Sequence, residues 1–185
     1  MKSVLFVIIL FLIFSCEPYK DGIRAGIINK NVIYTEISPP KQVMILGKDS
    51  IDIDADSQYD LVFYKSPKPL LSGFSTKTEI LKKSNIQIIM DSDNQYPVCL
   101  DYEDAINSSS KWSETDQEYY ILQSYICGSN YCPVIGNFAN VSDKYLAFKL
   151  GNNYGWIKLD NSISGNLTIK GFALSNWNLT NYPGW

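Results

Sequence analysis

The sequence predicts an all-β protein, in which an antiparallel β-sandwich or jelly-roll-like single domain follows an N-terminal signal peptide and a tether. Short runs rich in Val, Ile, Tyr and Phe recur from residue 31 onward, and apolar and polar residues alternate in most of them. Such alternation is typical of half-buried strands. Segments rich in Pro, Gly, Asn and Ser separate the runs. Outside the signal, no apolar repeat of helical period continues beyond about three turns.

The expected strands can be placed along the chain from these runs. They are NVIYTEI, KQVMILG, DLVFYK, NIQIIM, EYYILQSYI, KYLAFKL, YGWIKLD and NLTIKGFAL, at 31–37, 41–47, 60–65, 85–90, 118–126, 144–150, 154–160 and 166–174. The expected turns are SPP, KSPKP, GSN, GNNYG and NSISGN, at 38–40, 65–69, 128–130, 151–155 and 161–166. Only residues 101–114 have some helix or long-loop character. Short strands at this spacing favour a sandwich or a partial barrel.

The N-terminus has the features of a secretion signal. Lys2 precedes an apolar segment, residues 4–14, which is too short to span a bilayer. The segment leads into Ile13–Cys16, IFSC, which resembles the lipobox of bacterial lipoproteins. The resemblance implies cleavage before Cys16 and acylation of that cysteine, so that the membrane is a partner through the lipid. A plain secretory signal with a chance cysteine is the alternative.

Three regions follow from the lipobox and the strand pattern. We expect a lipoprotein signal peptide at 1–15, a lipidated tether at 16–30 and a β-sandwich-like domain at 31–185. The tether carries Pro and Gly and shows no sustained period. Glu17 stands where an aspartate often retains lipoproteins in the inner membrane, and so the outer membrane or the cell surface is the expected location.

Composition excludes several classes of function. The chain of 185 residues has 16 basic and 19 acidic residues, a formal net charge of -3. This balance argues against a nucleic-acid partner, because such proteins need a clustered basic face, and Arg24 is the only arginine. The chain has no histidine, which excludes Ser-His-Asp and Cys-His arrangements and histidine-based zinc sites. Paired carboxylates remain the main catalytic route.

The segment SIDIDADSQYDLVF is the strongest candidate for a metal site. With Asp52 as position 1, acids fall at positions 1, 3, 5 and 9, and Gln58 at position 7 can offer its backbone carbonyl. The predicted ligands are Asp52, Asp54, Asp56, Gln58 and Asp60. Carboxylates this close repel one another unless a cation neutralises them, and an oxygen-only set suits calcium, Ca2+, better than zinc. A solvated acidic hairpin tip is the alternative.

This loop resembles the D-x-D-x-D-G-x-x-D-hydrophobic loop of secreted bacterial β proteins. YLAFKLGNNYGWIKLD followed by LTIKGFALS resembles a pattern in uncharacterised exported all-β proteins of Bacteroidota. The matching positions are Tyr145, Leu146, Phe148, Tyr154, Gly155, Trp156, Ile157, Leu159, Thr168, Ile169, Phe172 and Ala173. The resemblance covers about residues 50–175; Ser57 and Ala147 stand where glycine is usual. It implies an exported all-β domain and no particular activity.

Aromatic residues could bind a ligand or fill a core. Tyr154 and Trp156 share one face of an expected strand, where they could stack on a sugar ring, although a buried core tryptophan between two sheets is favoured. Three aromatics near the C-terminus could form a ligand platform or cover a sheet edge, which is favoured. They are Trp177, Tyr182 and Trp185.

Two further groups of residues are candidates for chemistry. Glu114, Asp116 and Glu118 alternate as in the E-x-D-x-E catalytic strand of a jelly-roll glycoside-hydrolase family, which they resemble. The alternative for them, a charged loop or exposed strand edge, is favoured. A disulfide between Cys127 and Cys132 would close the turn CGSNYC, and it is weighed evenly against any other state of the cysteines.

These observations lead to one functional expectation and a rival. We expect an outer-membrane or cell-surface lipoprotein that acts as a non-catalytic binding or structural module, stabilised by calcium. Its partner would be a glycan or an envelope protein. The rival is a small jelly-roll glycoside hydrolase that uses Glu114, Asp116 and Glu118.

Overall fold

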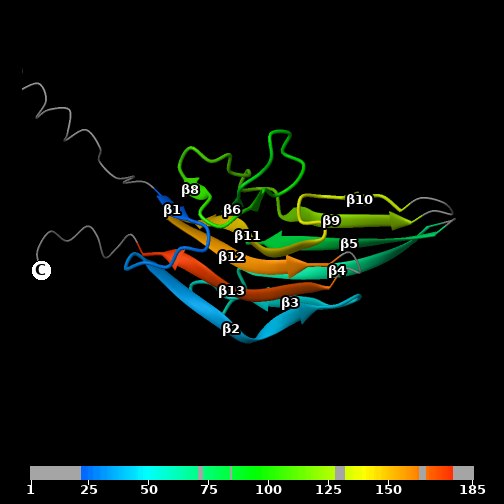
Figure 1. Cartoon of the computed structure of the whole chain (residues 1–185), viewed down its shortest axis with the longest axis horizontal. Coiled ribbons are helices and arrows are strands. Elements are labelled where there is room, and N and C mark those ends of the chain that lie inside the picture. The colour runs from blue at the N-terminus through cyan, green and yellow to red at the C-terminus, as the bar shows by residue number, and fades with distance from the viewer. Residues whose placement is uncertain (1–21, 71–72, 84, 128–131, 163–165, 177–185) are drawn as a thin grey trace, which may run out of the picture.

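The computed structural model describes residues 22–70, 73–83, 85–127, 132–162 and 166–176 (Figure 1). Within these ranges every element of regular secondary structure is a β-strand, and the paired strands are antiparallel. The predicted all-β, sandwich-like class is confirmed.

The first sheet has five strands in the order β10-β9-β5-β4-β3. They are β3 (Lys48–Ile51), β4 (Leu61–Leu70), β5 (Gly73–Lys82), β9 (Tyr119–Cys127) and β10 (Val134–Ile135). β5 was not predicted from the sequence. Two of its inward positions, Thr78 and Lys82, are buried although they are polar, so the strand lacks a clean apolar alternation.

The second sheet has six strands, of which five follow the order β2-β13-β12-β11-β6 and the sixth, β7, also pairs with β11. The strands are β2 (Val32–Val43), β6 (Ile86–Ile88), β7 (Cys99–Leu100), β11 (Val141–Leu150), β12 (Asn153–Asn161) and β13 (Leu167–Ser175). β11, β12 and β13 are consecutive antiparallel neighbours, as expected for alternating runs joined by short polar turns.

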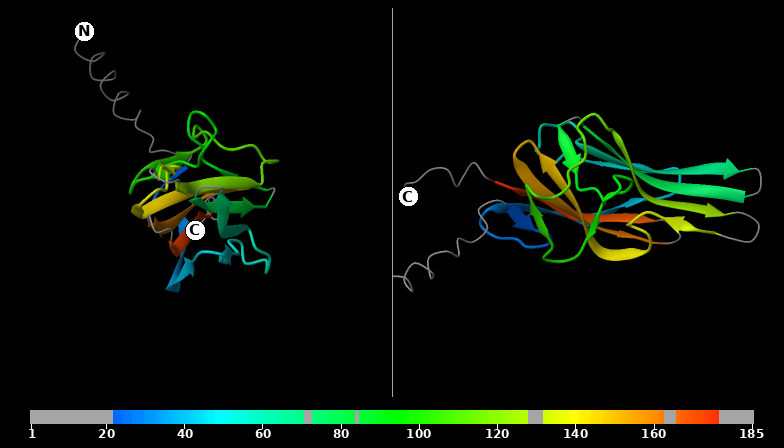
Figure 2. Two further views of the ribbon diagram at one scale, coloured as in Figure 1. Left: turned by 90° about the vertical axis from the view of Figure 1, so that its right-hand side faces the viewer. Right: turned by 90° about the horizontal axis from the view of Figure 1, so that it is seen from above.

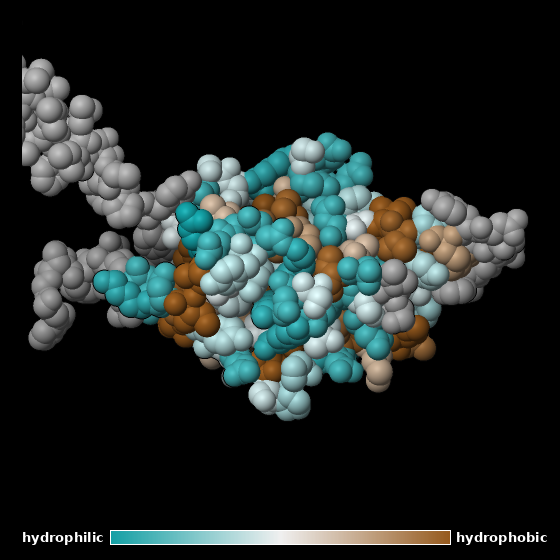
Figure 3. Space-filling view, viewed as in Figure 1, coloured by the Kyte–Doolittle hydropathy of each residue, from teal (hydrophilic) through white to brown (hydrophobic). Residues whose placement is uncertain are grey.

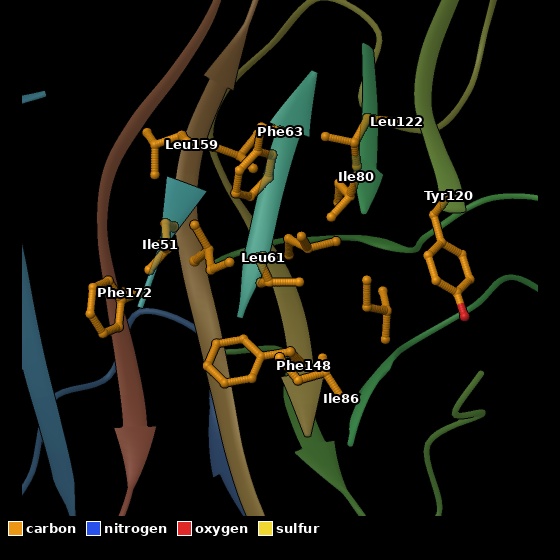
Figure 4. Close-up of a cluster of buried hydrophobic side chains, with 14 of the residues drawn as sticks. Ile51, Leu61, Phe63, Ile80, Ile86, Tyr120, Leu122, Phe148, Leu159 and Phe172 are labelled. Atoms are coloured by element: carbon orange, nitrogen blue, oxygen red, sulfur yellow. The ribbon is translucent and has the colours of Figure 1, made fainter. Parts of the chain in front are cut away.

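The two sheets pack face to face, and the main core lies between them (Figures 2 and 4). Leu61 and Phe63 of β4 point into this core from one sheet, and Ile157 and Leu159 of β12 point into it from the other. Each pair is two residues apart, which is the spacing that places side chains on the same face of a strand. The core therefore follows directly from the alternation in the sequence.

A third layer covers the opposite face of the six-stranded sheet. β1 (Gly22–Arg24) and β8 (Ala105–Asn107) form a two-stranded sheet, and a second core lies beneath it (Figure 1). Trp156 belongs to this second core and is 2% exposed. The predicted burial of Trp156 in a core is confirmed. The sheet that covers it is the small β1–β8 sheet and not the five-stranded one, because strand alternation shows which face a residue shares without showing what covers that face.

The folded part of the chain begins earlier than expected. β1 pairs with β8, and Ile23 and Ala25 are buried, so residues 22–25 belong to the domain and not to a flexible tether. Arg24 and Ala25 are further tied to the loop before β8 by bonds with Glu103 and Asp104. The predicted tether at 16–30 therefore overlaps the fold, because a three-residue strand is too short to leave a period in the sequence.

Two predicted turns lie inside strands. SPP is part of β2, an edge strand that bulges between Glu36 and Lys41, and KSPKP is part of β4. The first residue of β3, Lys48, pairs with Tyr64 of β4, so β3 does not run beside the later residues of β4. Pro67 and Pro69 lie in that later part. Within the described residues, no strand there needs a backbone N–H from β4 on the β3 side, and proline is tolerated in a sheet at such positions.

The predicted strand at 41–47 ends early. Residues 44–47 form a turn closed by a bond from Gly47 N–H to the Met44 carbonyl oxygen, 2.8 Å. Its apolar side chains are exposed, with Leu46 at 81%. Figure 3 shows apolar patches among the hydrophilic residues of one face of the molecule.

Candidate metal centre

The acidic loop connects β3 to β4 in the five-stranded sheet. Ile51 ends β3 directly opposite Leu61, which begins β4, and both side chains are buried in the main core. The Asp60 N–H donates to the Ile51 carbonyl oxygen at 2.9 Å and closes the base of the loop. Residues 52–60 are therefore held at both ends by core residues, as a site for a small ion requires.

Inside the loop, aspartate side chains accept hydrogen bonds from backbone N–H groups. Asp52 Oδ2 accepts from Ser57 at 2.9 Å, and Asp56 Oδ1 accepts from Gln58 at 2.8 Å. Ser57 has a φ of 68°, in the left-handed region that favours glycine. Ser57 thus adopts the conformation that explains why glycine is usual at this position in the loops that the sequence resembles.

The loop brings three of the predicted ligands together. Carboxylate oxygens of Asp52, Asp54 and Asp60 all lie within 4.8 Å of one another, and these residues could hold a metal ion. Asp56 lies outside this group. The backbone N–H of Gln58 donates to Asp56 Oδ1. That the carbonyl oxygen of Gln58 is a ligand stays a prediction.

Asp60 is the buried centre of the group. It is 1% exposed, and its Oδ2 accepts hydrogen bonds from Ile53 N–H at 2.7 Å and from Asp54 N–H at 3.4 Å. Its Oδ1 makes no hydrogen bond but lies 3.2 Å from Lys83 Nζ, close enough for an ion pair. Asp52 Oδ1 is also buried and has no hydrogen-bond partner in the described part of the chain. Two carboxylate oxygens are therefore free of backbone donors.

The charges of the loop influence one another. Loss of solvation, followed by the negative charge of Asp60, raises the pKa of Asp54 above its usual range. Burial lowers the pKa of Lys83, but its ion pair with Asp60 and the charge of Asp56 outweigh burial, so this pKa is raised overall. The charge of Asp60 thus contributes to both shifts.

Lys83 was missed by sequence reasoning. It follows β5, and its N–H donates to the Asp60 carbonyl oxygen at 3.0 Å, so the end of β5 places it beside the loop. Its Nζ also lies 3.5 Å from Asp56 Oδ2. No sequence signal marks this contact, since it depends on the pairing of β5 with β4.

A hollow of about 330 Å³ lies next to the loop. The residues that line this hollow come from the acidic loop, β4, β5 and the segments beside them: Tyr59, Asp60, Val62, Leu81, Lys82, Lys83 and Glu118. Tyr59 is 66% exposed. An aromatic ring beside an acid and a base is a combination suited to binding a polar ligand.

Glu114, Asp116 and Glu118 are all exposed and lie in the irregular segment that precedes β9. They form the charged, exposed segment that the sequence analysis favoured. They do not form the strand that the E-x-D-x-E resemblance implies. The segment instead supplies backbone contacts, with Lys82 Nζ donating to the Thr115 carbonyl oxygen at 3.0 Å.

The structure joins Cys127 and Cys132 in a disulfide. Cys99 is a free thiol, and burial raises its pKa to about 11. A thiol with so high a pKa is a poor nucleophile at neutral pH. Other predicted residues lie outside the described residues: Cys16, Trp177, Tyr182 and Trp185.

Comparisons with known proteins give no relative for this fold or this loop. No family model matches the chain, and neither the search of curated proteins nor that of solved structures finds a match. In the part of the chain that the structure describes, no helix has the length and apolar character needed to cross a bilayer.

Proposed function

We propose that the chain is a lipid-anchored protein of the outer membrane or cell surface, with a non-catalytic binding or structural β-sandwich that calcium stabilises. The observation that carries the proposal is the oxygen-only group of Asp52, Asp54 and Asp60 at the β3–β4 connection. The lipobox at Ile13–Cys16 supports the anchor. A calcium ion coordinated by these side chains would cross-link the β3–β4 connection, as a disulfide does elsewhere, in a compartment where calcium is accessible.

The ligand chemistry favours calcium over transition metals. Soft or borderline metals prefer imidazole or thiolate, and the chain has no histidine. Carboxylate and carbonyl oxygens suit hard cations, and calcium accepts the irregular geometry of a loop more readily than magnesium does. Asp52 and Asp60 each keep one oxygen that no backbone donor uses, and those oxygens are available to such an ion.

Thermal unfolding in calcium and in chelator tests this proposal. Because calcium binds only the folded loop, about a hundredfold excess over its Kd should stabilise the fold by about 2.7 kcal/mol. A domain of this size would then melt roughly 5–10 °C higher than in chelator. Asp54→Ala should abolish the difference, and Asp93→Ala, an exposed aspartate in another turn, should retain it. If wild type and Asp54→Ala respond alike, the proposed calcium site is wrong.

A glycan or an envelope protein is the expected partner, and the hollow supplies groups for a glycan. Tyr59 could stack on a sugar ring while Glu118 and Lys83 bond its hydroxyl groups. Tyr59→Ala should weaken retention on a polysaccharide panel. Tyr102→Ala, which removes a tyrosine of similar exposure elsewhere, should not.

The rival glycosidase has less support. A hydrolase needs an acid and a base held rigidly on either side of the bond that is cleaved. Glu114 and Glu118 are exposed in an irregular segment, which provides little control of position or pKa. Hydrolysis of a polysaccharide that disappears in Glu118→Gln would favour the rival over the binding module.

A further inference from the structure

We infer that Lys83 is a built-in competitor of the metal ion at the acidic loop. The inference rests on the proposed calcium site and adds to it the residue that limits how tightly the site binds. It also predicts that the contribution of Lys83 to stability changes with metal.

The fold holds Lys83 beside the loop through its backbone. The pairing of β4 with β5 ends at Leu61 and Lys82, which makes residues 60 and 83 neighbours. The Lys83 N–H donates to the Asp60 carbonyl oxygen at 3.0 Å. The ammonium group therefore starts from a fixed backbone position, and its reach toward the carboxylates follows from strand register.

The ammonium group and the metal ion need the same oxygen atom. Asp60 Oδ2 already accepts two backbone hydrogen bonds, from Ile53 and Asp54. Only Asp60 Oδ1 remains for a metal ion, and it faces Lys83 Nζ at 3.2 Å. A divalent cation bound to Oδ1 would repel an ammonium at this distance. Metal binding therefore requires Lys83 to move away.

The hollow gives the displaced ammonium group a place to go. Lys83 and Asp60 line one part of it, and Glu118, whose carboxylate is exposed, is a further lining residue. The side chain of Lys83 is itself 28% exposed, so its rotation into the hollow disrupts no packed core. Lys83 thus exchanges Asp60 and Asp56 for solvent or Glu118 when the ion binds.

The sign of the Lys83 contribution follows from this exchange. Without metal, the ammonium group neutralises a carboxylate that is 1% exposed, and an unpaired charge in that position is costly. With metal bound, the ion neutralises Asp60, and the ammonium group adds only repulsion. Lys83 stabilises the metal-free fold and opposes the metal-bound one.

Calcium titration by calorimetry and thermal melting, on the full chain extracted from membranes in detergent, tests the inference. Lys83→Met keeps the aliphatic stem and removes the charge. It should bind calcium about two- to fivefold more tightly than wild type, the factor by which a partly exposed ion pair shifts an equilibrium. It should melt below wild type in chelator and no lower than wild type in calcium.

Two control variants isolate the charge at this position. Lys77→Met removes a lysine of β5, the strand that precedes Lys83, which has no ion pair with a described residue, and it should match wild type in both conditions. Lys83→Arg keeps the charge and should bind calcium about as weakly as wild type.

Each other outcome is decisive. The inference would be wrong if Lys83→Met and wild type bound calcium with equal affinity. It would also be wrong if the variant lost the same melting temperature in chelator and in calcium. Either result would make Lys83 a structural ion-pair partner and leave the proposed calcium site standing. Failure of Lys83→Met to fold even in calcium would overturn it too, because the ion should replace the ammonium group. No calcium binding by wild type and Lys83→Met would overturn the proposed calcium site itself.

Discussion

Asn161 of β12 donates a hydrogen bond from Nδ2 to Oε1 of Gln123 in β9 at 2.6 Å, and both side chains are buried. The bond joins the six-stranded sheet to the five-stranded sheet through the interior. The same Nδ2 donates to the Phe138 carbonyl oxygen at 2.9 Å. Asn161 Oδ1 is buried without a hydrogen-bond partner among the described residues, so the Nδ2 bonds are what link this amide to the other sheet and restrict how the two sheets can slide.

Removal of Asn161 should destabilise the domain. Asn161→Ala leaves Gln123 Oε1 and the Phe138 carbonyl oxygen without a donor, and we expect a loss of about 2–3 kcal/mol in the free energy of unfolding. Urea denaturation of Asn161→Ala, Gln123→Ala and the double variant measures the coupling, expected at about 1 kcal/mol or more. Additive losses would show that the two amides act independently.

Gly155 should not tolerate a side chain. It lies opposite Phe148, and a Cβ at residue 155 would come within 2.1 Å of the Phe148 ring and 2.5 Å of the Ala173 carbonyl oxygen. Since Phe148 is fully buried, Gly155→Ala should cost about 2–3 kcal/mol by overpacking. Gly151→Ala meets no atom of the described residues within 4 Å and should cost only about 1 kcal/mol, because its φ is +57°. Similar denaturation midpoints for the two variants would contradict this explanation.

Acid sensitivity should depend on Lys170. Hydrogen bonds from Lys158 and Lys170 lower the pKa of Asp143. Burial raises the pKa of Asp160, but bonds from Lys170 and from the Asp143 N–H outweigh burial, so the pKa of Asp160 is also lowered. Carboxyl groups with lowered pKa stabilise the fold above their unfolded pKa of about 4, and this stabilisation is lost as pH falls through the folded pKa.

The matching experiment compares Lys170→Met with wild type at two pH values. The pairs are partly exposed, so the variant should lose no more than about 1 kcal/mol at pH near 7. The loss should disappear at pH near 2, where the carboxyl groups are protonated. Lys48→Met, an exposed lysine without an ion pair to a described residue, should follow wild type throughout. A loss that persists in acid would point to packing by the lysine stem instead.

Lipidation should depend on Cys16 alone. Metabolic labelling with an alkyne fatty acid should mark wild type and Cys99→Ala, the variant of the free thiol, but not Cys16→Ala. Acyl chains are transferred only to the lipobox cysteine in the lipoproteins that the N-terminus resembles. Label on Cys16→Ala, or none on wild type, would remove the anchor from the proposed function.

Several elements could be predicted because their signal is local. β11, β12 and β13 each appear as a short run rich in apolar and aromatic residues that is bounded by turn residues, and the aspartates of the acidic loop are visible as a spacing. β5 could not be predicted, because buried Thr78 and Lys82 interrupt its apolar face. The prolines of β4 could not be placed in a strand either. They are tolerated there because β3 pairs only with Leu61–Tyr64 and leaves the later residues of β4 without a partner in β3.

Local patterns of residues were enough to predict the class of the fold, the faces of its strands and the acidic loop as a candidate cation site. These properties depend on residues that are near one another in the chain, where alternation and spacing act directly. Tertiary structure alone decided that Trp156 lies under β1 and β8, that Asp60 is buried, and that Lys83 reaches it. Such contacts depend on which distant strands pair and in what register, and no local pattern encodes that choice.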